Sequence, residues 1–322
     1  MARCGCRTSC SGRSRTPRST SPRRSGRISA RPSFSRRCAS SRRASAASGE
    51  WWTVARIRPG CVLRTRLATA AVALPLLIWL ILGSAPWVFA GVIVGFTAVG
   101  LGESAAMALP EHRPARVLSI VAGLAFAAAV VSGRPGALGA ALFATLAGGL
   151  FVTLFDRDLP GAIARFANAM VAALYAGFLL PHVVSLRLLP GGERWVFFAI
   201  ACAMGSDTGA YFAGRFTGRA KLMPRVSPNK TVEGAVGGLL GSVVLAVFAW
   251  AVLPPPGERL EALIFLSLAF SVLAQAGDLI ESALKRAYGA KDSGWIIPGH
   301  GGVLDRIDSL VLPFVFAYYV NA

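Results

Sequence analysis

Long apolar runs separated by short polar breaks dominate the chain after residue 65. Most runs approach the roughly twenty residues that a helix needs to cross a bilayer, and the alternating pattern of a transmembrane β-barrel is not seen. We therefore predict an all-α, polytopic integral membrane protein with about nine transmembrane helices. The predicted spans are roughly 66–83, 87–102, 116–133, 136–155, 163–186, 195–214, 234–253, 260–282 and 303–320.

Composition and turn residues agree with this pattern. Apolar residues make up 54% of the chain and charged residues only 15%, whereas a soluble domain of this length would need more surface charge. Glycine and proline fall between the runs, where they favour turns over continued helix. Such breaks occur at 83–86, 133–135, 190–192 and 254–257.

Residues 1–60 differ from the rest and form a predicted Arg/Ser-rich extension. The first 50 residues contain thirteen Arg, one Glu and almost no large apolar side chains, so we expect disorder. Three explanations are open: a polybasic tail held by anionic lipid, a nucleic-acid-binding arm, or an artefact of the chosen start codon. Since Phe34 is the only aromatic residue before Trp51, we expect no nucleic-acid partner.

Lys and Arg residues in the loops predict how the helices are oriented. Loops that follow even-numbered spans hold twelve of them, whereas loops that follow odd-numbered spans hold only Arg134, Arg187, Arg194 and Arg259. By the positive-inside rule, the even-numbered loops and the N-terminus lie in the cytoplasm and the C-terminus lies outside. The charge-dense loops 215–233 and 283–302 then both face the cytoplasm.

The residues that we expect to do chemistry lie in the part 205–310 of the membrane domain 61–322. The predicted span 195–214 contains Ser206, Asp207, Thr208 and Tyr211. Small and hydroxyl residues alone would suit helix packing, but packing does not need a carboxylate at this depth. Asp207 is therefore a candidate functional residue.

A basic, glycine-containing loop follows this span and ends at Lys230 and Thr231, where the next span begins. Unpaired backbone N–H groups and the helix dipole favour a phosphate at such a position. A P-loop is excluded, because it would need glycines where Pro224 and Asn229 stand. A loop that only orients the protein would explain the arginines but not Glu233.

Two carboxylate pairs follow, each with a spacing of three residues that places both members on one helix face. Asp278 and Glu281 end the span 260–282, with Ser282 and Lys285 on the same face, and Asp305 and Asp308 open the last span. With Asp207 these carboxylates supply enough oxygen atoms for one or two cations, and hard oxygen ligands suit Mg²⁺. An internal salt bridge between Glu281 and Lys285 is the alternative for the first pair.

The segment 282–308 concentrates charge between two apolar spans, and charge placed against hydrocarbon more often marks a working site than a tolerated defect. Its Lys and Arg residues can hold phosphate, and its glycines let backbone approach a ligand. His300 could act as a general base. A phosphate nucleophile is already ionised at neutral pH, however, so a structural or hydrogen-bonding role fits His300 equally well.

This segment resembles, at every defined position, the signature of the phosphatidate cytidylyltransferases, also called CDP-diacylglycerol synthases. The likeness covers residues 65–322 and is strongest after residue 205. The Arg/Ser-rich extension has no counterpart as a block in that family, so nothing carries over to it. Three other stretches look like further blocks of the family, namely 206–211, 227–234 and 275–281.

The resemblance implies an enzyme of phospholipid biosynthesis that transfers a cytidylyl group from CTP to phosphatidate, giving CDP-diacylglycerol and pyrophosphate. It also implies a Mg²⁺-dependent homodimer in the bacterial cell membrane, with its active site facing the cytoplasm. The implied carboxylates are Asp207, Asp278, Glu281, Asp305 and Asp308, of which Asp207, Asp278 and Asp305 would hold the metal. The implied ligands of substrate phosphate are Lys230, Thr231, Ser282, Lys285, Arg286, Lys291, His300 and Arg306.

Two other functions are compatible with charge inside a membrane. A secondary transporter would use carboxylates for ion coupling, but it would show broken helices in both halves, whereas here the ionisable groups cluster after residue 205. A lipid or polyprenol kinase that uses CTP or ATP would share the charge pattern. The resemblance of segment 282–308 favours cytidylyl transfer over phosphorylation.

Overall fold

A computed structural model describes residues 74–294 and 302–322 of the chain. The chain divides into two units, residues 1–64 and 65–322, and every described residue belongs to the second unit. The predicted Arg/Ser-rich extension, the first part of the predicted span 66–83 and His300 lie outside the described residues.

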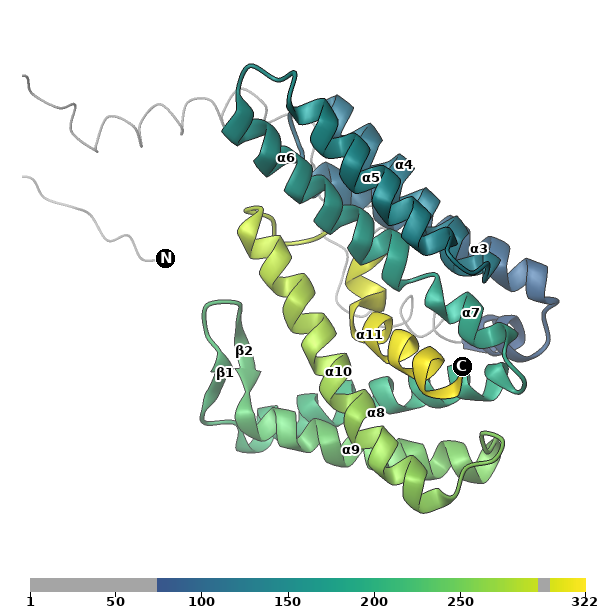
Figure 1. Cartoon of the computed structure of the whole chain (residues 1–322). Helices are drawn as coiled ribbons and strands as arrows, with labels where there is room; N and C mark the ends of the chain where they lie inside the picture. The colour runs from purple at the N-terminus through teal and green to yellow at the C-terminus, as the bar shows by residue number, and fades with distance from the viewer. Residues whose placement is uncertain (1–73, 295–301) are drawn as a thin grey trace, which may run out of the picture. The chain divides into compact units, whose positions relative to one another are not determined.

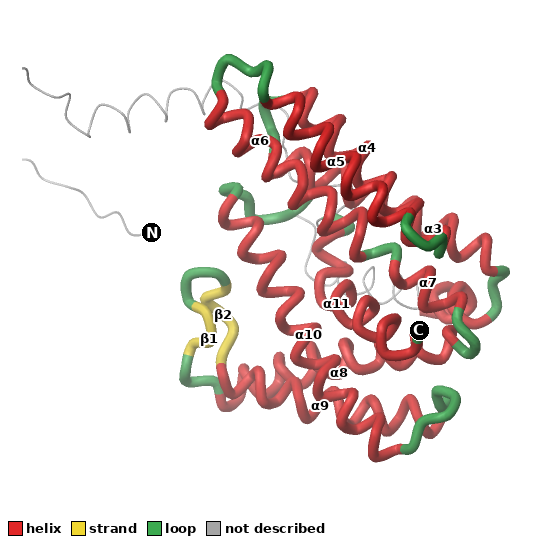
Figure 2. Tube along the Cα trace, viewed as in Figure 1, coloured by secondary structure: helices red, strands yellow, loops and turns green. Residues whose placement is uncertain are grey.

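Helices account for most of the described residues (Figures 1 and 2). Residues 74–82 are helical and precede α3. The helices that follow are α3 (Pro86–Ala108), α4 (Arg113–Ser132), α5 (Ala137–Thr153), α6 (Leu159–Ala172), the π-helix η1 (Ala173–Leu179), α7 (His182–Leu188), α8 (Gly192–Thr217), α9 (Val232–Val252), α10 (Leu260–Ala287) and α11 (Leu304–Asn321). Two short strands, β1 (Lys221–Met223) and β2 (Ser227–Thr231), pair antiparallel in the loop between α8 and α9.

The all-α, polytopic class is confirmed, whereas the number of nine spans is not. Among the described residues, six helical segments are long and apolar enough to cross a membrane, and α6, η1 and α7 together form one of them. The apolar α5 has only 17 residues. α11 has 18 residues but carries Asp305, Arg306 and Asp308 in its first turns, which lowers its hydropathy. The long helices indicate a multi-pass membrane protein.

Glycine residues stand at two of the predicted breaks for a conformational reason. Gly133 ends α4 with a φ of 58°, and Gly191 precedes α8 with a φ of 68°. Both values lie in the left-handed region, which residues with a Cβ atom rarely adopt. The breaks predicted between these helices from glycine and proline are therefore confirmed.

α11 lies where two groups of helices meet (Figure 1). One group consists of α3, α4, α5 and α6, which pack against one another, and the other consists of α8, α9 and α10. α11 packs against α7, α8 and α10 and also contacts α3 and η1. Residues in the first turn of α11 can therefore meet side chains from both groups.

Facing glycines let α8 and α9 pack backbone against backbone. A Cβ atom on Gly205 of α8 would clash with the carbonyl oxygen of Gly241 of α9, and one on Gly209 would clash with that of Gly237. Small residues four positions apart are a common basis for close helix packing in membranes. Because β1 and β2 connect these two helices, the close packing also determines where the hairpin begins and ends.

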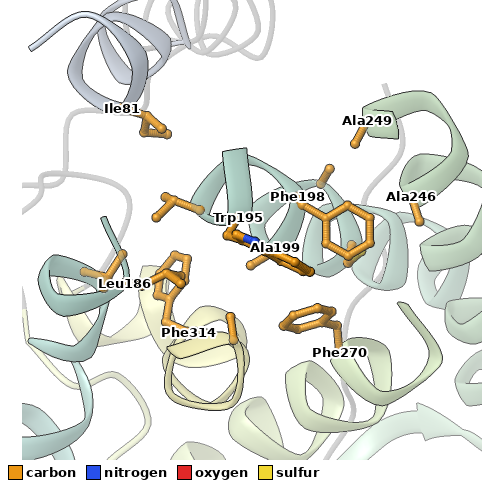
Figure 3. Close-up of a cluster of buried hydrophobic side chains, with 14 of the residues drawn as sticks. Ile81, Leu186, Trp195, Phe198, Ala199, Ala246, Ala249, Phe270 and Phe314 are labelled. Atoms are coloured by element: carbon orange, nitrogen blue, oxygen red, sulfur yellow. The ribbon is translucent and has the colours of Figure 1, made fainter. Parts of the chain in front are cut away.

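A hydrophobic core surrounds the first half of α8 (Figure 3). Phe198 is buried between Trp195 of the same helix and Phe270 of α10, with ring centroids 5.8 and 5.7 Å away. Phe314 of α11 and Leu186 of α7 belong to the same cluster. This apolar half of α8 carries no charged residue of the predicted site, which begins at Asp207.

We expect Gly241→Ala to destabilise the protein, because the new methyl group would meet the carbonyl group of Gly205. Overpacking of this kind costs about 1–3 kcal/mol. The matched control is Gly95→Ala on α3, where a Cβ atom meets nothing within 4 Å. In thermal unfolding in one detergent, the midpoint should fall for Gly241→Ala and stay or rise for Gly95→Ala. Equal midpoints would contradict the close packing of α8 and α9.

Candidate functional site

A cavity of about 450 Å³ lies between α8, α9 and α10 beside the β1–β2 hairpin. The structure brings four of the sequence-predicted site residues together on its wall, namely Asp207, Lys230, Thr231 and Asp278. Its volume is in the range of pockets that take small molecules. The polar lining also includes Tyr211, Arg215, Asn229 and Gln275.

The junction of β2 and α9 positions the basic side of the cavity. Thr231 is the N-cap residue of α9, and its hydroxyl accepts a hydrogen bond from the Gly234 N–H at 3.1 Å. Lys230 directs its Nζ to Asp278 Oδ2 of α10, 2.7 Å away. The side chains of Lys230 and Asp278 are 25% and 34% exposed, so this ion pair is open to the cavity.

Glu233 has a structural role, although a loop that served only to orient the protein in the membrane would not need it. Both of its carboxylate oxygens accept hydrogen bonds from the Ala220 N–H, at 3.1 and 3.2 Å. Ala220 directly precedes β1, so this contact holds the start of the hairpin against the first turn of α9. The hairpin that carries Lys230 is thereby fastened at both ends.

Gln275 is a cavity residue for which the sequence suggested no role. Its Nε2 donates to the Ala235 carbonyl at 3.1 Å and to Ser271 Oγ at 3.2 Å, which fixes the orientation of the amide. Ser206, directly before Asp207, is buried, and its Oγ lies 2.8 Å from Ser271 Oγ. This network of hydroxyl and amide groups joins α8, α9 and α10 behind the cavity.

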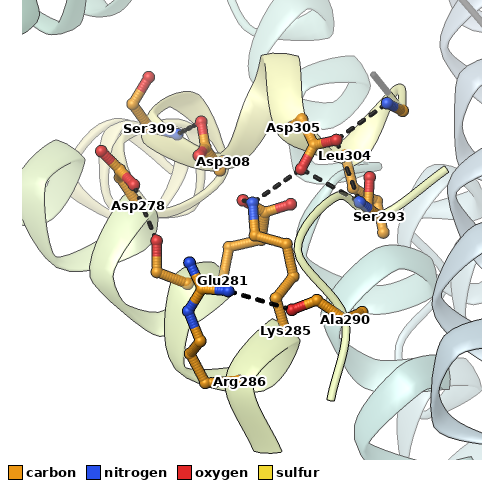
Figure 4. A network of polar contacts seen from close by, with 12 residues as sticks. Asp278, Glu281, Lys285, Arg286, Ala290, Ser293, Leu304, Asp305, Asp308 and Ser309 are labelled. Atoms are coloured by element: carbon orange, nitrogen blue, oxygen red, sulfur yellow. Dashed lines mark hydrogen bonds and ion pairs between the residues drawn. The ribbon is translucent and has the colours of Figure 1, made fainter. Parts of the chain in front are cut away.

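A second polar cluster joins α10 to α11 (Figure 4). Lys285 Nζ lies 2.7 Å from Glu281 Oε2 and 2.7 Å from Asp305 Oδ1. The alternative of a Glu281–Lys285 salt bridge is thus present, and Lys285 also reaches Asp305. Asp305 Oδ2 accepts further hydrogen bonds from the Ser293 N–H at 3.1 Å and the Gly302 N–H at 2.9 Å. One ammonium group therefore offsets two carboxylates.

Asp308 lies on the side of α11 that faces Asp278 (Figure 4). α10 and α11 approach closely here, because Gly277 leaves no side chain between its Cα atom and the Asp308 carbonyl. The carboxyl groups of Asp308 and Glu281 lie close enough to influence each other electrostatically. Glu281 is buried, and no donor among the described residues reaches its Oε1. The two negative charges repel each other when both groups are ionised.

Metal ligation fits this site only in part. Among the described residues, no three His, Cys, Asp or Glu side chains come close enough together to hold a metal ion. Asp207 and Asp278 share the cavity, whereas the Asp305 carboxylate is engaged by Lys285 and by backbone N–H groups. Carboxylate oxygens are the ligands that Mg²⁺ prefers, so the donor chemistry fits this cation.

Of the other predicted phosphate ligands, those within the described residues do not line the cavity. Ser282 donates to Asp278 Oδ1 at 3.4 Å, which extends the cluster by one turn of α10. Arg286 is exposed and donates to the Ala290 carbonyl at 3.3 Å. Lys291 and Arg306 are also exposed. Their roles in binding substrate stay predictions, as does the role of His300.

Glu103 of α3 is the residue near the site that the sequence reasoning missed. Its buried carboxylate accepts hydrogen bonds from the Val303 and Leu304 N–H groups, both at 3.1 Å. It stands alone in an apolar helix, without the paired spacing that drew attention to the other carboxylates. The signal that could have found it is the cost of a single charge within an apolar span.

Comparison with known proteins places this chain in a family. A model described as the cytidylyltransferase family matches residues 64–322, which include every described residue. A phosphatidate cytidylyltransferase of Bacillus subtilis (strain 168) is 44% identical over 153 residues, which are 47% of this chain and 56% of that protein. The phosphatidate cytidylyltransferase of Brucella suis biovar 1 is 44% identical over 152 residues, which are 46% of this chain and 54% of that protein.

A third relative, the phosphatidate cytidylyltransferase of Staphylococcus saprophyticus subsp. saprophyticus, is 45% identical over 151 residues, 46% of this chain and 57% of that protein. The chain thus spans about half the length of the curated relatives that it matches. The family model, in contrast, extends over most of the chain. On that match, the chain belongs to the cytidylyltransferase family.

Proposed function

We propose that this protein transfers a cytidylyl group from CTP to phosphatidate, giving CDP-diacylglycerol and pyrophosphate. The observation that carries the proposal is the cavity in which Asp207 and Asp278 meet Lys230 and the start of α9, within a bundle of apolar helices. The names of the relatives support this reaction over other uses of such a cavity. The family match supports CTP as the nucleotide.

The reaction brings two anions together, and the residues of the cavity suit that problem. A phosphate oxygen of phosphatidate would attack the α-phosphorus of CTP, and the bond between the α-phosphorus and the leaving pyrophosphate would break. The nucleophile is ionised at neutral pH, so no residue has to remove a proton. Lys230 and the N-terminus of α9 would stabilise the charge on the triphosphate. Lys285, Arg286, Lys291 and Arg306 remain our candidates for the lipid phosphate and the pyrophosphate.

We also propose that the activity depends on Mg²⁺. Asp207 and Asp278 would hold the ion, with Glu281 and Asp308 nearby and Asp305 as a supporting group bound to Lys285. When bound, Mg²⁺ would supply positive charge against the phosphate oxygens and the departing pyrophosphate. The unpartnered Oε1 of Glu281 is a further oxygen atom in this cluster.

The proposed setting is the cytoplasmic leaflet of the bacterial cell membrane. Phosphatidate is a lipid and would enter sideways from the bilayer, whereas CTP would arrive from the cytoplasm. Large apolar side chains are exposed on the helices, as at Phe143, Phe151 and Phe265, which suits contact with lipid. The excess of Lys and Arg in the loops 215–233 and 283–302 supports the cytoplasmic placement. We propose a homodimer on the resemblance alone.

The direct test uses the full chain purified in detergent, with phosphatidate, Mg²⁺ and CTP labelled on either the α- or the γ-phosphate. Cytidylyl transfer puts the α label into the lipid product and releases the γ label in pyrophosphate. A γ label in the lipid would instead show a kinase. If neither label reaches the lipid and EDTA makes no difference, the proposal fails and ion transport becomes the function to test.

Substitutions in the cavity should remove activity without unfolding the protein. We expect Asp278→Asn and Lys230→Met each to lower kcat about 100-fold or more, because each removes one charge of the pair that faces the cavity. The matched control is Asp158→Asn, an exposed N-cap position on α6 where asparagine also caps well. Turnover at the wild-type rate in either cavity variant would remove that residue from the proposed centre.

Metal removal should separate the role of the carboxylates from that of the basic residues. EDTA is expected to abolish transfer, and added Mg²⁺ should restore it. Asp207→Asn should raise the Mg²⁺ concentration that gives half-maximal activity by about tenfold or more, because one oxygen ligand is weakened. Asp158→Asn should leave that concentration unchanged. An unaltered Mg²⁺ requirement in Asp207→Asn would show that this carboxylate does not bind the ion.

A further inference from the structure

Glu103 is a buried carboxylate whose main partners are backbone N–H groups. It lies near the C-terminal end of α3, and the whole residue is 5% exposed. No Lys or Arg side chain among the described residues forms an ion pair with it. A charge that is removed from water in this way needs several hydrogen-bond donors to compensate for its lost hydration.

Those donors come from the start of α11, some 200 residues later in the chain. Glu103 Oε1 accepts from the Val303 N–H and Oε2 from the Leu304 N–H, both at 3.1 Å. The first N–H groups of a helix have no acceptor within the helix and carry the positive end of its dipole. The side chain of Val303 cannot cap α11, so a carboxylate from α3 takes over that task.

Two glycines make room for this contact. A Cβ atom on Gly294 or on Gly302 would clash with the Glu103 carboxylate. Ser293, beside Gly294, also directs its hydroxyl to Glu103 Oε2 at 3.5 Å. The density of glycine around the start of α11 is thus explained in part by the approach of Glu103.

Asp305 holds neighbouring backbone positions of the same region. It accepts hydrogen bonds from the N–H groups of Ser293 and Gly302 and is bound to Lys285 of α10. Glu103 and Asp305 together therefore fasten the start of α11 to α3 and to α10. The same turn carries Asp308 next to Asp278, so a shift of this turn would move Asp308 away from the cavity residues.

We propose that Glu103 is a positioning residue for the transfer reaction. By capping α11 from α3, it sets the place of the first turn of α11, and through that turn the places of Asp305 and Asp308 relative to Asp278. Glu103 does not line the cavity, so it would act only through the residues of α11. This inference rests on the proposed function, although the capping itself can be tested without it.

The test compares Glu103→Gln with the wild type in the labelled-CTP assay. Glutamine keeps the shape, but it leaves one of the two N–H groups facing an NH₂ group instead of an oxygen. We expect kcat to fall about 100-fold, because small displacements of catalytic groups are that costly. The KM for CTP should change little, since Lys230 and Thr231 lie on β2 and touch neither Glu103 nor α11.

The matched control is Thr97→Val in the same helix. Thr97 is also buried, but among the described residues its hydroxyl donates only to the Ile93 carbonyl of α3, so the kinetic constants should stay at wild-type values. Hydrogen exchange provides a readout that does not depend on activity. In Glu103→Gln, exchange should rise in peptides that contain residues 302–306, while the thermal midpoint stays near that of Thr97→Val.

The outcomes are distinct. Wild-type kcat in Glu103→Gln would overturn the proposal. A lower kcat would also overturn it if hydrogen exchange rose throughout the protein and the thermal midpoint fell, because general destabilisation would then explain the loss. If Glu103→Gln does not fold, Glu103→Asp retains the charge on a shorter side chain: reduced kcat with normal KM would support positioning, and normal kcat would contradict it. If the wild type itself transfers no label, the proposed function fails, and the exchange at 302–306 still decides whether Glu103 caps α11.

Discussion

A carboxylate that leaves water needs a counter-charge or several hydrogen-bond donors, and this requirement governs how α3, α10 and α11 meet. Lys285 is 2.7 Å from both Glu281 and Asp305 and so offsets two carboxylates with one ammonium group. Glu103 meets the same requirement with backbone N–H groups of α11. Any displacement of α11 would leave at least one of these charges without its partner, so the polar contacts specify the position of the helix.

Apolar packing provides the frame in which these contacts form. The glycines of α8 and α9 let the two helices touch through their backbones, and the aromatic cluster around Phe198 joins α8 to α10. Neither contact uses a charged side chain. The cavity lies where this packing ends, beside the hairpin. Polar residues such as Asp207 and Lys230 line it there. The apolar first half of α8 thus packs in the hydrophobic core, and its second half lines the cavity.

Much of the site was predictable from local rules. The spacing of three residues in Asp278–Glu281 and Asp305–Asp308 places each pair on one helix face, and the helices observed there agree. The partners were less predictable. Asp305 was expected beside Asp207 and Asp278, yet it is engaged by Lys285 and the loop backbone, whereas Asp308 faces Asp278. Glu103 was missed because it has no paired carboxylate near it in sequence and its main partners are backbone groups of a distant segment.

The membrane-spanning character, the approximate helices and the breaks between them could be predicted from the amino-acid sequence, because hydropathy and turn residues act over a few neighbouring positions. The same pattern showed which residues carry charge in apolar surroundings. Which of these charges meet became visible in the folded chain alone. Pairing across helices depends on the rotation and depth of each helix, which are set by contacts such as Gly277 against Asp308 and Glu103 against the start of α11. Such contacts join residues far apart in the chain, so no local pattern encodes them.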